Sequence, residues 1–154
     1  MPFRIISPAF QNEGMIPSQY TCDGRNVSPP LEWADPPAET LAFALIHDDP
    51  DAPAGDWVHW VAWNIPADKK GLPENFPKDG ELKDGTRQGT TDFGRVGYGG
   101  PCPPSGVHRY FFKLYALKSL LDLAPGSTKA DLLASAKNLT LASCQFYGKY
   151  QRKR

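Results

Sequence analysis

Two short stretches of this chain combine histidine and aromatic side chains, and carboxylate or hydroxyl groups, with rigid loop residues. The first, residues 48–60, reads DDPDAPAGDWVHW, and the second, residues 97–110, reads GYGGPCPPSGVHRY. Imidazole, indole and phenol groups supply hydrogen-bond donors for an oxyanion. Proline fixes the backbone around them, and glycine allows close approach. This combination predicts a preformed pocket for a small anion such as phosphate.

The spacing within each stretch predicts which side chains share a wall of that pocket. Trp57 precedes His59 by two residues, and His108 precedes Tyr110 by two. Because side chains of a strand repeat every second position, each pair is expected on one face. Arg109 then points the other way, and we expect it to bond carboxylates or loop carbonyls.

Two aspartates of the first stretch are candidates for orienting an imidazole. A carboxylate beside a histidine favours its charged form and fixes the ring. Asp49 and Asp51 are both placed for this role. For Asp51 we favour the alternative, in which it caps backbone N–H groups of the loop. A cis peptide bond is expected at Ala52–Pro53, where the loop turns sharply.

Other kinds of site are less well supported by the sequence. The chain has no Walker loop, Gly-x-Ser-x-Gly elbow, His-Glu-x-x-His helix or dinucleotide fingerprint. His47, His59, His108 and Asp49 could together bind zinc. We expect no metal and no cofactor, because His47 is predicted to end a strand, unrelated to the other histidines. A hydrolase with His59 or His108 as general acid/base stays open, although no nucleophile is evident.

Composition places the chain among ordinary globular proteins. Its 154 residues predict one domain, and 17 basic residues balance 17 acidic ones. With no net charge, the protein has no overall positive electrostatic field that would attract nucleic acid. No apolar run approaches the ~20 residues of a membrane span. The amino terminus has no hydrophobic leader, which predicts a cytoplasmic protein.

Two further expectations concern the cysteines and the basic tail. Cys22, Cys102 and Cys144 match no zinc spacing, and their odd number makes reduced thiols the default. A contact between Cys22 and Cys102 stays open, because both lie in Gly/Pro-containing loops. Residues 149–154 are expected to form a frayed, solvated tail.

Short apolar segments separated by Pro and Gly predict a mainly β fold, a sandwich or barrel. A strand over residues 41–46 is expected to be buried on both faces. Capping-box residues from Thr128 to Asp131 predict one helix that ends near Asn138. Residues 67–91 read as loops with room for a short strand. Further strands are predicted at 59–65, ended by Pro66, and at 110–117, 139–147, 3–7 and 31–33.

The ordered motifs resemble the phosphatidylethanolamine-binding protein family, also called Raf kinase inhibitor proteins. The residues that carry the resemblance are DPDAP at 49–53, WVHW at 57–60 with NIP at 64–66, and GPCPPSGVHRY at 100–110. TCDGRNVSPPLEW at 21–33 and TDFG at 91–94 are similar to the bacterial and archaeal branch. The resemblance covers nearly the whole chain.

The resemblance implies a two-sheet antiparallel β-sandwich with a few short helices and a small anion pocket at one end of the main sheet. It also implies a second cis bond, at Gly55–Asp56, and a homodimer. Animal members continue beyond the last strand with a helix, so this chain is expected to have a more open site. The implied ligand-binding residues are Asp49, Pro53, Trp57, His59, Gly100, His108 and Tyr110, with Asp23 close by.

Three functions follow, of which a non-catalytic binding protein for a phosphate- or carboxylate-bearing ligand is the leading one. The second is a regulator of a protein partner, such as a kinase or protease, acting through the pocket rim. Trp60 or Tyr98 could serve as its exposed anchors, although we favour packing of both under the loops. The third is the weak hydrolase.

Overall fold

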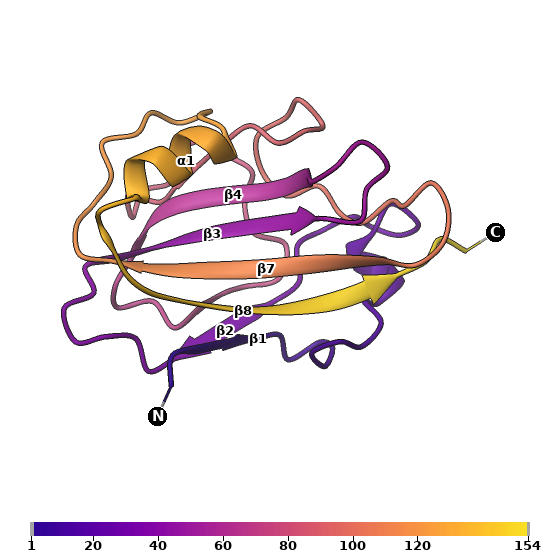
Figure 1. Cartoon of the computed structure of the whole chain (residues 1–154), viewed down its shortest axis with the longest axis horizontal. Helices are drawn as coiled ribbons and strands as arrows, with labels where there is room; N and C mark the ends of the chain where they lie inside the picture. Colours follow the sequence, from indigo (N-terminus) through magenta and orange to yellow (C-terminus); the bar gives the residue numbers. More distant parts are fainter. Residues whose placement is uncertain (1, 154) are drawn as a thin grey trace.

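The larger of two antiparallel sheets forms the centre of the molecule in the computed structural model, which describes residues 2–153 (Figure 1). All neighbouring strands in it are antiparallel. Its strands, in spatial order, are β6 (Arg87–Gln88), β4 (Trp57–Pro66), β3 (Ala42–Asp49), β7 (His108–Leu117) and β8 (Thr140–Tyr150).

A smaller sheet lies on one face of the larger one, and a helix lies on the other (Figure 1). The small sheet has the order β1 (Arg4–Ile6), β2 (Leu31–Ala34) and β5 (Gly71–Leu72). The helices are the 3-10 turn η1 (Ser18–Tyr20) and α1 (Lys129–Ala136). The predicted mainly β fold with two antiparallel sheets is confirmed. None of the helices in the described part of the chain is long and apolar enough to cross a membrane.

Both faces of the larger sheet are buried along its central strands β3 and β4, which explains the unbroken apolar run of β3. Phe43 and Leu45 pack with Trp33 of the small sheet. The alternate residues of the same strand, Ala44 and Ile46, pack on the helix side. A strand covered on both faces needs apolar side chains at successive positions, as the sequence predicted.

The helix begins at the predicted capping box. The Thr128 side chain accepts a hydrogen bond from the backbone of Asp131, whose carboxylate bonds the backbone N–H of Thr128 in return. Leu132 and Ala136 are the buried residues of α1. The helix ends at Ala136, slightly before the predicted Asn138.

Several strand ends differ from the prediction, most clearly those of β3 and β4. β3 continues past residue 46 through His47, Asp48 and Asp49, all of them buried. β4 begins at Trp57 rather than at residue 59 and includes Pro66, which pairs with Ala42 at the end of the strand. The sequence did not indicate the extension of β3, because polar residues are usually exposed. These three can be buried because each has a hydrogen-bonding partner inside the protein.

The basic tail is not frayed over its described residues. β8 runs to Tyr150, three residues beyond the prediction. The Tyr150 hydroxyl and the backbone N–H of Lys153 both donate to the Asp23 carboxylate, at 2.6 and 3.1 Å. Arg152 lies 3.5 Å from the same carboxylate. Asp23 therefore anchors the tail.

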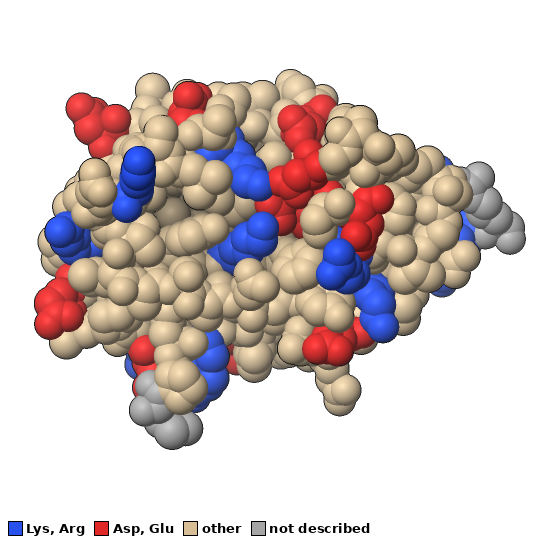
Figure 2. Space-filling view, in the orientation of Figure 1, with Lys and Arg blue, Asp and Glu red and all other residues tan. Residues whose placement is uncertain are grey.

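Antiparallel pairing brings one set of strand ends together. β3 ends where β4 and β7 begin, on the right in Figure 1, and the described tail lies at the same end. The two stretches singled out in the sequence are the loops at this end. Elsewhere on the face drawn in Figure 2, basic and acidic side chains lie next to one another rather than in separate fields.

Candidate functional site

A cavity of about 230 Å³ lies between the two loops at this end of the larger sheet. Six of the eight predicted site residues line it: Asp49, Pro53, Trp57, His59, His108 and Tyr110. The expectation that Trp57 and His59 share one wall, and that His108 and Tyr110 share another, is confirmed. The His108 and Tyr110 rings are stacked, with centroids 6.3 Å apart.

Asp49 orients the ring of His108. Its Oδ2 accepts a hydrogen bond from Nδ1 of His108 at 2.7 Å, and both side chains are buried. The other oxygen, Oδ1, accepts from the backbone N–H of Asp51 at 2.8 Å. Because a carboxylate accepts and does not donate when ionised, Nδ1 carries a proton. His108 therefore keeps Nε2 for the cavity.

His59 is oriented by the backbone of the other loop. Its Nδ1 donates to the carbonyl oxygen of Gly99 at 2.7 Å, and the Gly99 N–H donates back to the His59 carbonyl at 2.9 Å. Burial lowers the pKa of His59 below its usual 6.5, and the Gly99 carbonyl opposes that shift in part. In the neutral ring, Nε2 carries the lone pair.

Tyr110 contacts both imidazoles of the cavity, those of His59 and His108. Its ring is 5.2 Å from His59 and nearly perpendicular to it. Burial, helped by the neighbouring Asp49 carboxylate, raises the pKa of the phenol far above its usual 10. The hydroxyl is therefore a neutral donor at every pH at which the protein would be studied.

His47 lies directly behind this wall, which corrects the expectation that it is unrelated to the other histidines. Its ring centroid is 5.4 Å from that of His59 and 3.8 Å from that of Phe112. Nδ1 donates to the Phe111 carbonyl, and Nε2 is buried without a partner. Burial lowers the pKa of His47 well below 6.5. Among residues 2–153, no cluster of three or more potential ligands could hold a metal ion.

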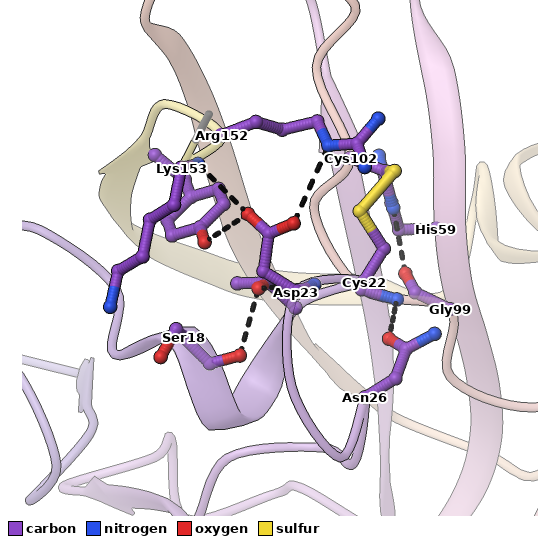
Figure 3. The surroundings of a disulfide bond; sticks show 12 residues. Ser18, Cys22, Asp23, Asn26, His59, Gly99, Cys102, Arg152 and Lys153 are labelled. Atoms are coloured by element: carbon purple, nitrogen blue, oxygen red, sulfur yellow. Dashed lines mark hydrogen bonds and ion pairs between the residues drawn. A yellow bond between two sulfur atoms is a disulfide. The ribbon is translucent and has the colours of Figure 1, made fainter.

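The loop that carries His108 is tied to the segment after η1 (Figure 3). Cys22 and Cys102 form a disulfide, which corrects the default of reduced thiols. The Cys22 N–H donates to the Pro101 carbonyl, and the Gly100 N–H donates to Oδ1 of Asn26 at 2.8 Å. These contacts hold Cys102, which lines the cavity, against a separate part of the fold.

Gly100 and Asp23 take part in this frame rather than in the cavity wall. A Cβ on Gly100 would lie 2.3 Å from the Tyr20 carbonyl oxygen, so only glycine fits there without a backbone shift. Asp23 follows Cys22 and anchors the tail, as Figure 3 shows. Neither residue is among those lining the cavity.

The first loop is stabilised by the predicted outward-pointing arginine. Arg109 donates from Nε and from a terminal nitrogen to the two oxygens of Asp51, each at 2.9 Å. Its backbone N–H also donates to Asp51, so that carboxylate accepts from a backbone N–H of β7 rather than from the expected N–H of its own loop. The expected cis bonds at Ala52–Pro53 and Gly55–Asp56 are wrong, because no described peptide bond is cis. Gly55, with φ +104°, turns the chain instead.

Sequence reasoning missed one whole wall of the cavity. Phe93 packs edge-on against Trp57 and His59, with centroids 5.5 and 5.2 Å away. It lies on a turn in which the N–H of Asp92 donates to the Val58 carbonyl and its carboxylate accepts from the Val58 N–H. The motif around it, TDFG, was visible, but nothing in its composition pointed to the cavity. The remaining lining residues are Ala52, Cys102, Pro103 and Pro104.

The fold and the pocket define the class of this protein: it is a small two-sheet β protein with an imidazole-lined pocket at one end of its main sheet. Residues 6–151 match the family model described as phosphatidylethanolamine-binding protein. This chain belongs to that family.

Relatives and solved structures agree. The chain is 56% identical to a UPF0098 protein of Methanothermobacter thermautotrophicus over 94% of this chain and 95% of that one. It is 48% identical to a UPF0098 protein of Aquifex aeolicus, over 96% and 88%. The crystal structure of a putative phosphatidylethanolamine-binding protein homologue from Chlamydia trachomatis superposes with a TM-score of 0.91 at 34% identity, covering 98% of both chains. That of E. coli YBCL gives 0.90 at 34% identity, covering 98% and 99%.

Proposed function

We propose that this protein binds a small phosphate- or carboxylate-bearing molecule in the cavity and does not transform it. The observation that carries the proposal is the pair of tethered imidazoles. The Nδ1 of His108 is held by Asp49 and that of His59 by Gly99. Each ring therefore has one nitrogen left for a ligand, and the neutral Tyr110 hydroxyl lies beside them.

Protonation couples to binding in this arrangement. A neutral imidazole whose Nδ1 donates elsewhere presents a lone pair at Nε2, which does not favour an anion. A protonated ring presents an N–H instead. The ligand is therefore expected to bind together with a proton.

The size and lining of the cavity favour a headgroup-sized ligand. Its volume, about 230 Å³, is below the ~300 Å³ at which pockets for drug-sized molecules begin. Pro53, Trp57, Phe93 and Pro103 provide apolar contact beside the imidazoles. Loops tied by a disulfide and an Asp51–Arg109 pair lose little entropy when a ligand binds.

Binding is favoured over nucleophilic catalysis by the state of the nearest nucleophile. Cys102 is the only serine, threonine or cysteine among the described residues that line the cavity, and its sulfur is bonded to Cys22. A regulator that uses Trp60 and Tyr98 as surface anchors has lost its support, because these side chains are 0% and 3% exposed.

A thermal-shift titration with phosphate and phosphorylethanolamine tests the proposal. Both ligands should raise the melting temperature of the wild type and leave that of His108→Ala unchanged. Lys118→Ala is the matched control, because Lys118 is exposed at the other end of β7. Equal shifts in wild type and His108→Ala would reject binding at this cavity, as would no shift in either.

The cytoplasmic location stays a prediction. The disulfide weighs against it, since such bonds are rare in the cytoplasm except in hyperthermophiles. Alkylation of cysteines in intact cells, followed by fractionation, would report both the location and the redox state of Cys22.

The homodimer also stays a prediction, and analytical ultracentrifugation tests it.

A further inference from the structure

A second, smaller cleft of about 140 Å³ adjoins the cavity. Phe93 belongs to the lining of both. A Cβ on Gly99 would lie 2.6 Å from the Phe93 ring, so the ring packs directly on the Gly99 backbone. The same Gly99 holds His59 through its carbonyl oxygen. One aromatic ring and one backbone segment therefore separate the two spaces.

The second cleft carries two cations that lack carboxylate partners. Lys78 and Arg95 line it, both are exposed, and among residues 2–153 neither forms an ion pair. Other exposed cations in the described part of the chain, such as Lys69 and Lys70, are also unpaired, so what distinguishes Lys78 and Arg95 is that both line the same cleft. The acidic residue nearest to Arg95 in this turn, Asp92, uses its carboxylate on the Val58 N–H.

Other residues that line the cleft also favour an anion. Asn26 accepts a hydrogen bond at Oδ1 from the Gly100 N–H, which leaves its amide N–H₂ as a donor. Gly97, with φ +96°, brings the backbone against the stem of Lys78, where a Cβ would lie 2.8 Å from that side chain. The lysine is therefore confined at its base while its ammonium group stays free.

We propose that this cleft is a second anion subsite, so that the ligand carries two acidic groups. This inference rests on the proposed function. One phosphate or carboxylate would bind at His108 and Tyr110, and a second would lie between Lys78 and Arg95. The span that joins them would pass Phe93, which favours an aliphatic or aromatic linker. The ligand class is a small diacid, rather than inorganic phosphate or a simple monoester.

Matched pairs of ligands test the inference. Alkylphosphonic acids and ω-carboxyalkylphosphonic acids of equal chain length differ only by the second acid. Calorimetric titration of the wild type should show that the diacid of the best length binds about tenfold more tightly than its partner, since exposed cations each contribute modestly. This preference should shrink as salt is raised, because the second pair of charges is exposed.

The double variant Lys78→Gln/Arg95→Gln should remove the preference and leave the affinity for the alkylphosphonic acid unchanged. Lys69→Gln/Lys70→Gln is the control, because it removes the same charge from exposed positions outside both linings and should keep the preference. Equal affinity for both acids in the wild type, or a preference that survives in the double variant, would overturn the second subsite alone. If neither acid binds the wild type, the proposed function falls together with it.

Discussion

His108 and Asp49, 59 residues apart in the chain, are joined by a 2.7 Å hydrogen bond inside the cavity. The bond links the first residue of β7 to the last residue of β3. It sets the tautomer of His108 and keeps Nε2 available to a ligand. The roles of both residues can be separated by substitution.

Asp49→Asn should weaken phosphate binding more than it weakens the fold. An amide oxygen can still accept from Nδ1, but the charge-assisted hydrogen bond that orients the His108 ring is lost. We expect affinity to fall about 10- to 100-fold, the cost of one charge-assisted hydrogen bond. Titration calorimetry measures this, with Lys118→Ala as the control. Unchanged affinity would exclude the carboxylate from binding.

Tyr110→Phe removes one hydroxyl donor while it keeps the stacked ring. Affinity for phosphate should fall about tenfold, because a single hydrogen bond contributes roughly 1 kcal/mol. The melting temperature should change little. A large loss of stability with no loss of affinity would instead make the hydroxyl part of the core, and circular dichroism alongside calorimetry distinguishes the two outcomes.

Phosphate affinity should rise as the pH falls. The pKa of His59 lies below 6.5 in the free protein because its ring is buried, and a bound anion would raise it. A proton is therefore taken up at His59 on binding, and affinity increases as the pH falls. Calorimetry in buffers of different ionisation enthalpy counts these protons. An affinity that is independent of pH would mean that the histidines remain neutral in the complex.

The stability of the free protein should have the opposite pH dependence. Burial lowers the pKa of His47 well below 6.5, so the unfolded chain binds a proton that the folded protein does not. Stability from this group is complete above pH 6.5 and is lost as the pH falls toward the folded-state pKa, by up to about 1.4 kcal/mol per pH unit. His59 adds a shift of the same sign. Urea unfolding measured at several pH values between 7 and 5 should show that the unfolding free energy depends less on pH in His47→Phe than in the wild type.

The disulfide should stabilise the fold strongly. It closes a loop with a sequence separation of 80 residues, for which the chain-entropy model gives about 4 kcal/mol. Cys22→Ser/Cys102→Ser should lower the unfolding free energy by that order, and the wild type in reductant should behave similarly. Cys144→Ser is the matched control, because Cys144 is a free thiol. A loss equal to that of the control would show that the surrounding backbone contacts suffice.

Hydrophobic pattern predicted the strands well because burial on both faces demands successive apolar residues. It failed at the end of β3, where His47 and Asp49 are buried and polar. Such residues look like loop residues until their partners are known, and the partners of these two lie in β7, more than 50 residues away. For the same reason the ordered tail was not predicted, because its partner Asp23 lies near the other end of the chain.

The candidate site was predictable where its residues share a short stretch. The alternation of Trp57 with His59 follows from strand geometry alone. Phe93 could not be placed in this way, because it reaches the cavity from a turn between distant strands. The disulfide posed the same problem. Their positions in Gly/Pro-containing loops made a contact between Cys22 and Cys102 conceivable, but only the fold brings their Cα atoms to 5.4 Å.

The two ends of the described chain leave the molecule at different places. β1, beside the amino terminus, lies in the small sheet at the bottom of Figure 1, whereas Lys153 lies against Asp23 at the end that holds the cavity. A tag, fluorophore or surface linkage at the carboxyl terminus would therefore crowd the binding loops and pull on the Asp23 anchor. Attachment through the amino terminus would present the cavity freely, so sensor chips and pull-down resins for this protein should be built from that end.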